Sequence, residues 1–74
     1  MKYFTLRLFN GRMLLETLSA NKPRKRFSIK VVKDVMKQYG ANYCEVYQSE
    51  HLGYAEGLPV KQIVLNNLNP LLTI

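Results

Sequence analysis

Seven basic side chains lie close together in the middle of the sequence, and their type and spacing indicate a definite chemistry. Four of them crowd around a proline, and three more recur at helical spacing further along. They are Lys22, Arg24, Lys25, Arg26, Lys30, Lys33 and Lys37. Cations spaced along a row in this way bind the phosphates of a nucleic-acid backbone and release the counterions condensed on it. We therefore expect these residues to form a phosphate-binding surface.

The distribution of charge supports this interpretation. The formal net charge is +6, and the segment 22–37, in which Asp34 is the one acidic residue, carries an excess of the same size. The flanking segments 1–21 and 38–74 carry +2 and −2 and cancel. Charge concentrated in one segment makes a local positive field, which attracts anionic partners more effectively than a diffuse excess does. The alternative is a solvated face that only keeps the protein soluble.

Two tyrosines on one predicted strand offer a second kind of contact. Tyr43 and Tyr47 would lie on the same face of that strand and could stack on bases beside a basic groove. The alternative is ordinary packing with the hydroxyl groups at the rim of the core. The sequence has no GXXG loop, RNP-like aromatic string, zinc-finger spacing or helix-turn-helix pair to support a known nucleic-acid-binding module.

Catalytic chemistry has little support in the sequence. The candidate side chains are Cys44 and His51, with Glu50, Tyr54 and Glu56 near them. A cysteine nucleophile needs a positioned base and an orienting group, and one cysteine with one histidine supplies the residue types without the geometry. We interpret Cys44 as a small buried hydrophobe and His51 as a loop residue. No metal-ligand spacing and no phosphate-cradling glycine loop is present, so we expect no enzyme activity, metal or cofactor.

Length and composition favour one small globular domain, 1–74. A chain of 74 residues with 47% hydrophobic and 22% charged residues can bury a core, although one of marginal stability. The single cysteine excludes an internal disulfide and favours a reducing compartment. No apolar run resembles a signal peptide or a membrane span, so we expect a cytoplasmic protein with no membrane partner.

The first element predicted is a β-hairpin with strands 2–9 and 12–18. Asn10-Gly11 lies between two alternating runs, and Asn-Gly supplies the positive φ angles of a type I′ turn. A two-residue loop would fix the register of the hairpin. The pairs expected on its apolar, core-facing side are Leu8 with Met13, Leu6 with Leu15 and Phe4 with Thr17.

A helix is predicted over 29–39. Ser28 is a suitable N-cap, Phe27 before it is placed to pack on Val32, and Gly40 is a suitable stop. The lysines of the basic cluster recur on the outward side of this helix. The residues expected to dock on the hairpin are Ile29, Val32, Val35, Met36 and Tyr39.

The remaining sequence predicts one or two further strands. Residues 42–48 alternate as a strand of which either face could point inward, and 49–59 is a loop. Residues 60–65 fit either a strand, which we favour, or a helical face behind Pro59. The fold expected is a small α+β two-layer sandwich of hairpin, helix and further strands, ββαββ. The apolar tail 70–74 needs burial on the domain or on another chain.

Two functions follow from these features. The first is nucleic-acid binding through the phosphate backbone with low sequence specificity, because no element is placed to read base edges. The alternative is a small protein-interaction factor, such as an inhibitor or adaptor, that docks on an acidic partner protein. Because a small core and an apolar tail both gain from a partner surface, we also expect a homodimer.

Overall fold

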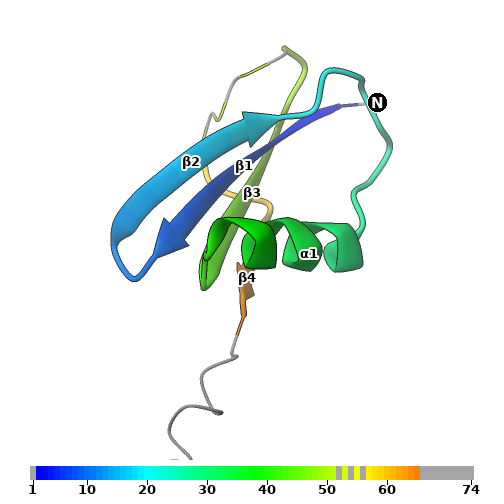
Figure 1. Cartoon of the computed structure of the whole chain (residues 1–74). Coiled ribbons are helices and arrows are strands. Elements are labelled where there is room, and N and C mark those ends of the chain that lie inside the picture. Colours follow the sequence, from blue (N-terminus) through cyan, green and yellow to red (C-terminus); the bar gives the residue numbers. More distant parts are fainter. Residues whose placement is uncertain (1, 52, 54, 56, 66–74) are drawn as a thin grey trace, which may run out of the picture.

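A computed structural model describes residues 2–51, 53, 55 and 57–65, and the predicted tail 70–74 lies outside these residues (Figure 1). Within these residues, four antiparallel strands form one sheet, and a single helix lies against one of its faces. The prediction of a small α+β domain is confirmed. Residues 61–64 form a strand, so the helical alternative for this region is wrong. The elements in chain order are β1 (Tyr3–Asn10), β2 (Met13–Ser19), α1 (Ile29–Tyr39), β3 (Tyr43–Ser49) and β4 (Lys61–Val64).

The order of the strands across the sheet is β2-β1-β3-β4. β1 is therefore an inner strand that pairs with both β2 and β3, whereas β2 and β4 are the edges. The segment between β2 and α1 is anchored to the sheet, because the backbone N–H and C=O groups of Lys2 and Arg24 bond to each other at 2.9 and 2.8 Å. This pairing fixes the segment that carries four of the seven basic residues singled out in the sequence.

α1 begins and ends where its capping residues predict. The Ser28 hydroxyl accepts a hydrogen bond from the Val31 N–H at 3.3 Å and satisfies one of the free amides of the first turn. Gly40 has a φ of 74°, a left-handed conformation that glycine adopts without steric cost. Its N–H donates to the Lys37 carbonyl at 3.3 Å, and the Ala41 N–H donates to the Met36 carbonyl at 2.8 Å. These two bonds form a Schellman motif, which satisfies the last carbonyls of the helix.

The core lies between α1 and the inner face of β1, β3 and β4. Its centre is made by side chains with no exposed surface: Leu8, Met36, Cys44 and Val46. At one side of the core, Phe27 packs edge to face against Phe4, with ring centroids 5.3 Å apart and an interplanar angle of 64°. β3 therefore turns Cys44 and Val46 inward, which settles the orientation that the alternating pattern left open.

The predicted register of the hairpin is wrong. Asn10 pairs with Met13, and a bulge follows, after which Leu8 pairs with Glu16 and Leu6 with Leu18. The loop is therefore Gly11-Arg12 instead of Asn10-Gly11. Gly11 has a φ of 63°, whereas Arg12, the second loop residue, has no positive φ, which is the pattern of a type II′ turn.

Hydrogen bonds to the far end of α1 explain this register. The Asn10 side-chain amide donates to the Gly40 carbonyl at 3.1 Å, and the Gly11 N–H donates to the Asn42 side-chain oxygen at 3.0 Å. Asn10 is thus held at the end of β1 and is not free to enter the turn. The bulge then adds one residue to β2, and the two effects together place Leu18, not Leu15, beside Leu6 on the inner face.

Several residues expected in the core are exposed instead. Ile29 and Tyr39, at the two ends of α1, are 44% and 43% exposed, because the helix meets the sheet mainly through Val32 and Met36. On the hairpin, the shifted register leaves Met13 63% and Leu15 36% exposed. Part of the inner face of the hairpin is therefore uncovered.

Truncation of a core residue tests this packing. Leu8→Ala should lower the free energy of unfolding by about 2–5 kcal/mol, because it removes three buried carbon atoms and leaves a cavity. The matched control Leu14→Ala, at a side chain 44% exposed, should cost less than about 1 kcal/mol. Urea denaturation followed by circular dichroism measures both. Equal losses in the two variants would contradict the assigned core.

Candidate functional site

The seven basic side chains singled out in the sequence are all exposed. Four of them lie in the segment that leads into α1, and three lie on α1 itself. They are Lys22, Arg24, Lys25 and Arg26 in the segment, and Lys30, Lys33 and Lys37 on the helix. We call this set the basic surface.

The three helix lysines project away from the sheet. Val32 and Met36 fix the inward side of α1, being 3% and 0% exposed. Successive residues of an α-helix are 100° apart, so Lys30, Lys33 and Lys37 fall within an arc of about 60° and point about 80° to 140° away from the inward direction. Between Lys30 and Lys37 the helix rises about 10 Å. These three cations therefore form a short stripe along the outer side of the helix.

Most charges of the basic surface have no acidic partner among the described residues. The described residues form the ion pairs Lys2–Glu50 at 3.1 Å and Lys30–Asp34 at 3.4 Å, and of these only the second involves the basic surface. The Lys30 and Asp34 side chains are 86% and 59% exposed, so water screens their attraction and the pair restrains Lys30 weakly. The first turn of α1 contains no acidic residue. The partial positive charge at the start of the helix therefore adds to the field of the cations.

The structure does not bring the two predicted stacking tyrosines onto the basic surface. Tyr43 and Tyr47 lie on the sheet face opposite α1, because they alternate with the inward-facing Cys44 and Val46. Tyr47 is 6% exposed and Tyr43 is half-buried. Stacking by these residues stays a prediction, and Tyr43 has the more accessible ring.

A carboxylate between the two tyrosines holds their hydroxyl groups. The Tyr43 hydroxyl donates to one oxygen of Glu45 at 3.2 Å, and the Tyr47 hydroxyl donates to the other at 2.8 Å. Burial, together with this carboxylate, raises the pKa of Tyr43, and the hydrogen bond to Glu45 raises the pKa of Tyr47. Arg7 lies 5.9 Å from the centre of the Tyr47 ring and pairs with Glu45 in the ladder. In this cluster the positive charge of Arg7 lies beside the negative charge of Glu45. The cluster therefore does not extend the basic surface.

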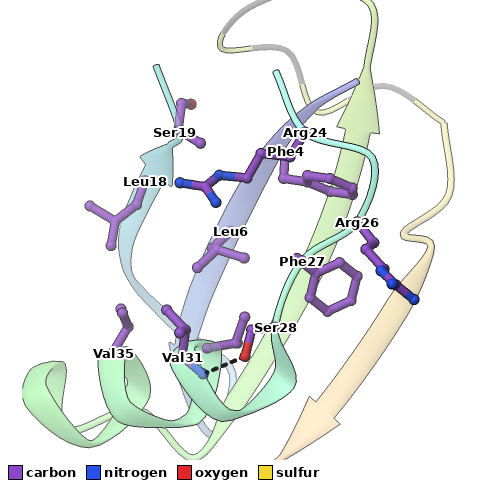
Figure 2. A pocket seen from close by; sticks show the side chains of 12 residues that line it. Phe4, Leu6, Leu18, Ser19, Arg24, Arg26, Phe27, Ser28, Val31 and Val35 are labelled. Atoms are coloured by element: carbon purple, nitrogen blue, oxygen red, sulfur yellow. Dashed lines mark hydrogen bonds between the residues drawn. The ribbon is translucent and has the colours of Figure 1, made fainter. Parts of the chain in front are cut away.

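An apolar groove beside α1 is a feature that the sequence did not reveal (Figure 2). It has a volume of about 680 Å³ and runs between α1, the inner face of the hairpin and the segment after β2. Its apolar lining includes Leu6, Leu18, Phe27, Val31 and Val35. Only the true register places Leu18 beside Leu6, so the predicted pairing concealed this groove.

Arg24 belongs to the rim of this groove as well as to the basic surface. Its guanidinium extends over the apolar floor toward Leu18, whereas Arg26 points away from the floor (Figure 2). The backbone pairing of Arg24 with Lys2 holds it there. Side chains alternate between the two faces along a strand, so Lys2 lies on the same side as Phe4 and Leu6. Arg24, which pairs with Lys2, lies on that inner side as well.

The residues considered for catalysis are not assembled. Cys44 is fully buried in the core, where burial, followed by the charge of Glu45, raises the pKa of its thiol to about 11. His51 lies beyond the end of β3 at Ser49, and the strand from Cys44 to Ser49 spans about 16 Å. Of Glu50, Tyr54 and Glu56, only Glu50 lies in the described part of the chain, where it pairs with Lys2. The described residues include no group of three acidic, histidine or cysteine side chains that could hold a metal ion.

No helix in the described ranges is long and apolar enough to cross a membrane. No family model matches the chain, and it matches neither a curated protein nor a solved structure. The function has therefore to be inferred from the chain's own residues and their arrangement.

The buried thiol gives a direct test of the core around Cys44. A thiol with a pKa of about 11 is protonated at pH 8, and its burial excludes reagents. The folded protein should therefore react with a disulfide reagent such as DTNB at least about 100-fold more slowly than the same protein in guanidinium chloride. Reaction of the folded protein at the rate of a free thiol would contradict this, and would reopen Cys44 as a nucleophile.

Proposed function

We propose that this protein binds the phosphate backbone of nucleic acids through the basic surface, with little discrimination between sequences. The observation that carries the proposal is the set of seven exposed cations, of which only Lys30 has an acidic partner among the described residues. Cations that are already solvated and unpaired can contact phosphates without first breaking ion pairs. Their binding is favoured by the release of counterions from the nucleic acid.

The anchoring of the basic segment supports the proposal. The pairing of Arg24 with Lys2 at one end and the Ser28 cap at the other hold the segment between them. A held segment loses less conformational entropy when it binds than a free chain does. The cations of the segment and of the helix stripe can therefore act together on one run of phosphates.

The kind of residue and its position both favour backbone contacts over base recognition. Five of the seven side chains are lysines, whose ammonium groups act as mobile point charges and do not offer the planar fork that reads a guanine edge. The tyrosine pair lies on the opposite face of the sheet, so it does not add base contacts at the basic surface. Binding through charge alone positions a protein on nucleic acid without specifying sequence.

The salt dependence of binding tests the proposal. Fluorescence anisotropy with labelled single-stranded and duplex oligonucleotides should show an affinity that falls steeply with salt. If about five cations engage, log affinity should fall against log salt with a slope of about −4.5 on duplex and about −3.5 on single strands. Absence of binding at low salt would exclude the proposal.

Substitutions on opposite faces distinguish a defined surface from general charge attraction. Lys33→Gln removes one cation from the stripe and should flatten the duplex slope by about 0.9, since glutamine keeps the helix propensity of lysine. Thr17→Glu changes the net charge by the same amount on the outer face of the sheet, opposite α1, and should leave the slope unchanged. The triple variant Lys30→Glu, Lys33→Glu and Lys37→Glu should abolish binding with the circular dichroism spectrum retained. Equal effects of Lys33→Gln and Thr17→Glu would show that no particular surface is used.

A further inference from the structure

The apolar groove exists because one helix is too narrow to cover the sheet. Neighbouring strands are about 4.8 Å apart, so four strands span about 14 Å between the outer strand axes, whereas a helix with its side chains is about 10 Å wide. α1 packs over β1, β3 and β4, whose side chains form the core cluster with Val32 and Met36. No residue of β2 is fully buried. The less covered part of the inner face lies over β2 and over β1 at Leu6.

The walls of the groove are apolar on three sides. Leu6 and Leu18 form the floor, Phe27 closes one side, and Val31 and Val35 of α1 form the other. Val31 is 57% exposed. The groove reaches β2 through Leu18, and β2 is an edge of the sheet among the described residues. An elongated partner could therefore lie along it.

One charge lies over this apolar floor. The Arg24 guanidinium extends across the groove toward Leu18, and no ion pair forms with it in the described part of the chain (Figure 2). An unneutralised guanidinium next to apolar surface favours an occupant that brings both apolar side chains and a carboxylate, which arginine can bind through two parallel hydrogen bonds.

We infer that the groove binds an amphipathic helix with acidic residues along one flank, supplied by a partner protein. Such a helix would occupy the position of a second helix on the sheet, with apolar side chains at i, i+3 or i+4 and i+7 between Val31, Val35 and Leu18. A carboxylate on its flank would meet Arg24. A nucleic acid does not fit the same floor, because its phosphates would lose water against apolar side chains without gaining partners.

This site is distinct from the phosphate-binding stripe. Val31 and Lys33 point about 160° apart around the helix axis, so the groove and the stripe lie on different sides of α1. The two surfaces meet only in the basic segment, at Arg24 and Arg26. The inference therefore does not depend on nucleic-acid binding, and either can fail without the other.

Selection of peptides tests the inference without a known partner. A phage library of helix-forming peptides would be panned on the full chain at a salt concentration that screens the distant charges of the basic surface. Enriched peptides should carry apolar residues at helical spacing and aspartate or glutamate on one flank. Absence of enrichment, or enrichment of peptides without acidic residues, would overturn the inference.

Variants then locate the bound peptide. Val31→Asp changes an exposed wall of the groove and should weaken an enriched peptide by about tenfold or more, as expected for an apolar anchor. Arg24→Gln should weaken it by about three- to tenfold and reduce its salt dependence. The control Leu14→Asp, 44% exposed on the opposite sheet face, should have no effect.

Two further outcomes would count against the groove. Equal binding to wild type and Val31→Asp would place the peptide elsewhere. Loss of peptide binding in the Lys30→Glu, Lys33→Glu and Lys37→Glu variant, at a salt concentration that screens distant charges, would assign it to the basic surface. Retention of binding in that variant, with nucleic-acid binding lost, would support two separate sites.

Discussion

The register of the β1–β2 hairpin is the constraint on which the rest of the structure depends. It is set by two side-chain amides, those of Asn10 and Asn42, which tie the turn to the end of α1 through the Gly40 carbonyl and the Gly11 N–H. Each such bond contributes about 1 kcal/mol, but a shift of register would break both at once and move other residues onto the inner face. The same bonds therefore determine where the turn begins and, together with the bulge in β2, which leucine meets Leu6.

The two surfaces of α1 follow from that arrangement. With Val32 and Met36 turned to the sheet, the lysines must point outward, while Val31 and Val35 face the hairpin edge that the helix does not reach. One short helix thus separates a charged surface from an apolar groove. The anchored segment before it carries Arg24 to the place where the two meet.

Local chemistry made part of the fold predictable from the sequence. Ser28 and Gly40 mark the helix ends because each satisfies backbone groups within a few residues, so their effect does not depend on distant parts of the chain. The outward position of the lysine stripe follows from helical periodicity in the same way. Residues 61–64 are a strand because they complete the sheet beside β3, a pairing between distant segments that apolar periodicity alone does not distinguish from a helix.

The features that could not be predicted depend on contacts between distant segments. Asn10-Gly11 has the sequence of a type I′ turn, but a bond to Gly40, thirty residues away, keeps Asn10 in β1. The position of Leu18, and with it the groove, follows from that bond and from the bulge that adds one residue to β2. The predicted basic residues were found exposed as expected, whereas Tyr43 and Tyr47 lie on the opposite side of the sheet because β3 turns Cys44 inward.

The bulge in β2 has a consequence for how this protein behaves at high concentration. Among the described residues β2 is an open edge with a run of exposed apolar side chains, Met13 to Leu15, and it contains neither proline nor lysine to discourage pairing with another chain. The bulge lies within this run, since the pairing shifts between Leu8 and Phe9 on the partner strand. A bulged edge is locally bent and more strongly twisted, so two such edges cannot align their hydrogen-bonding groups over their full length. The bulge that shifts the hairpin from its predicted register therefore also disfavours the addition of further strands at this edge.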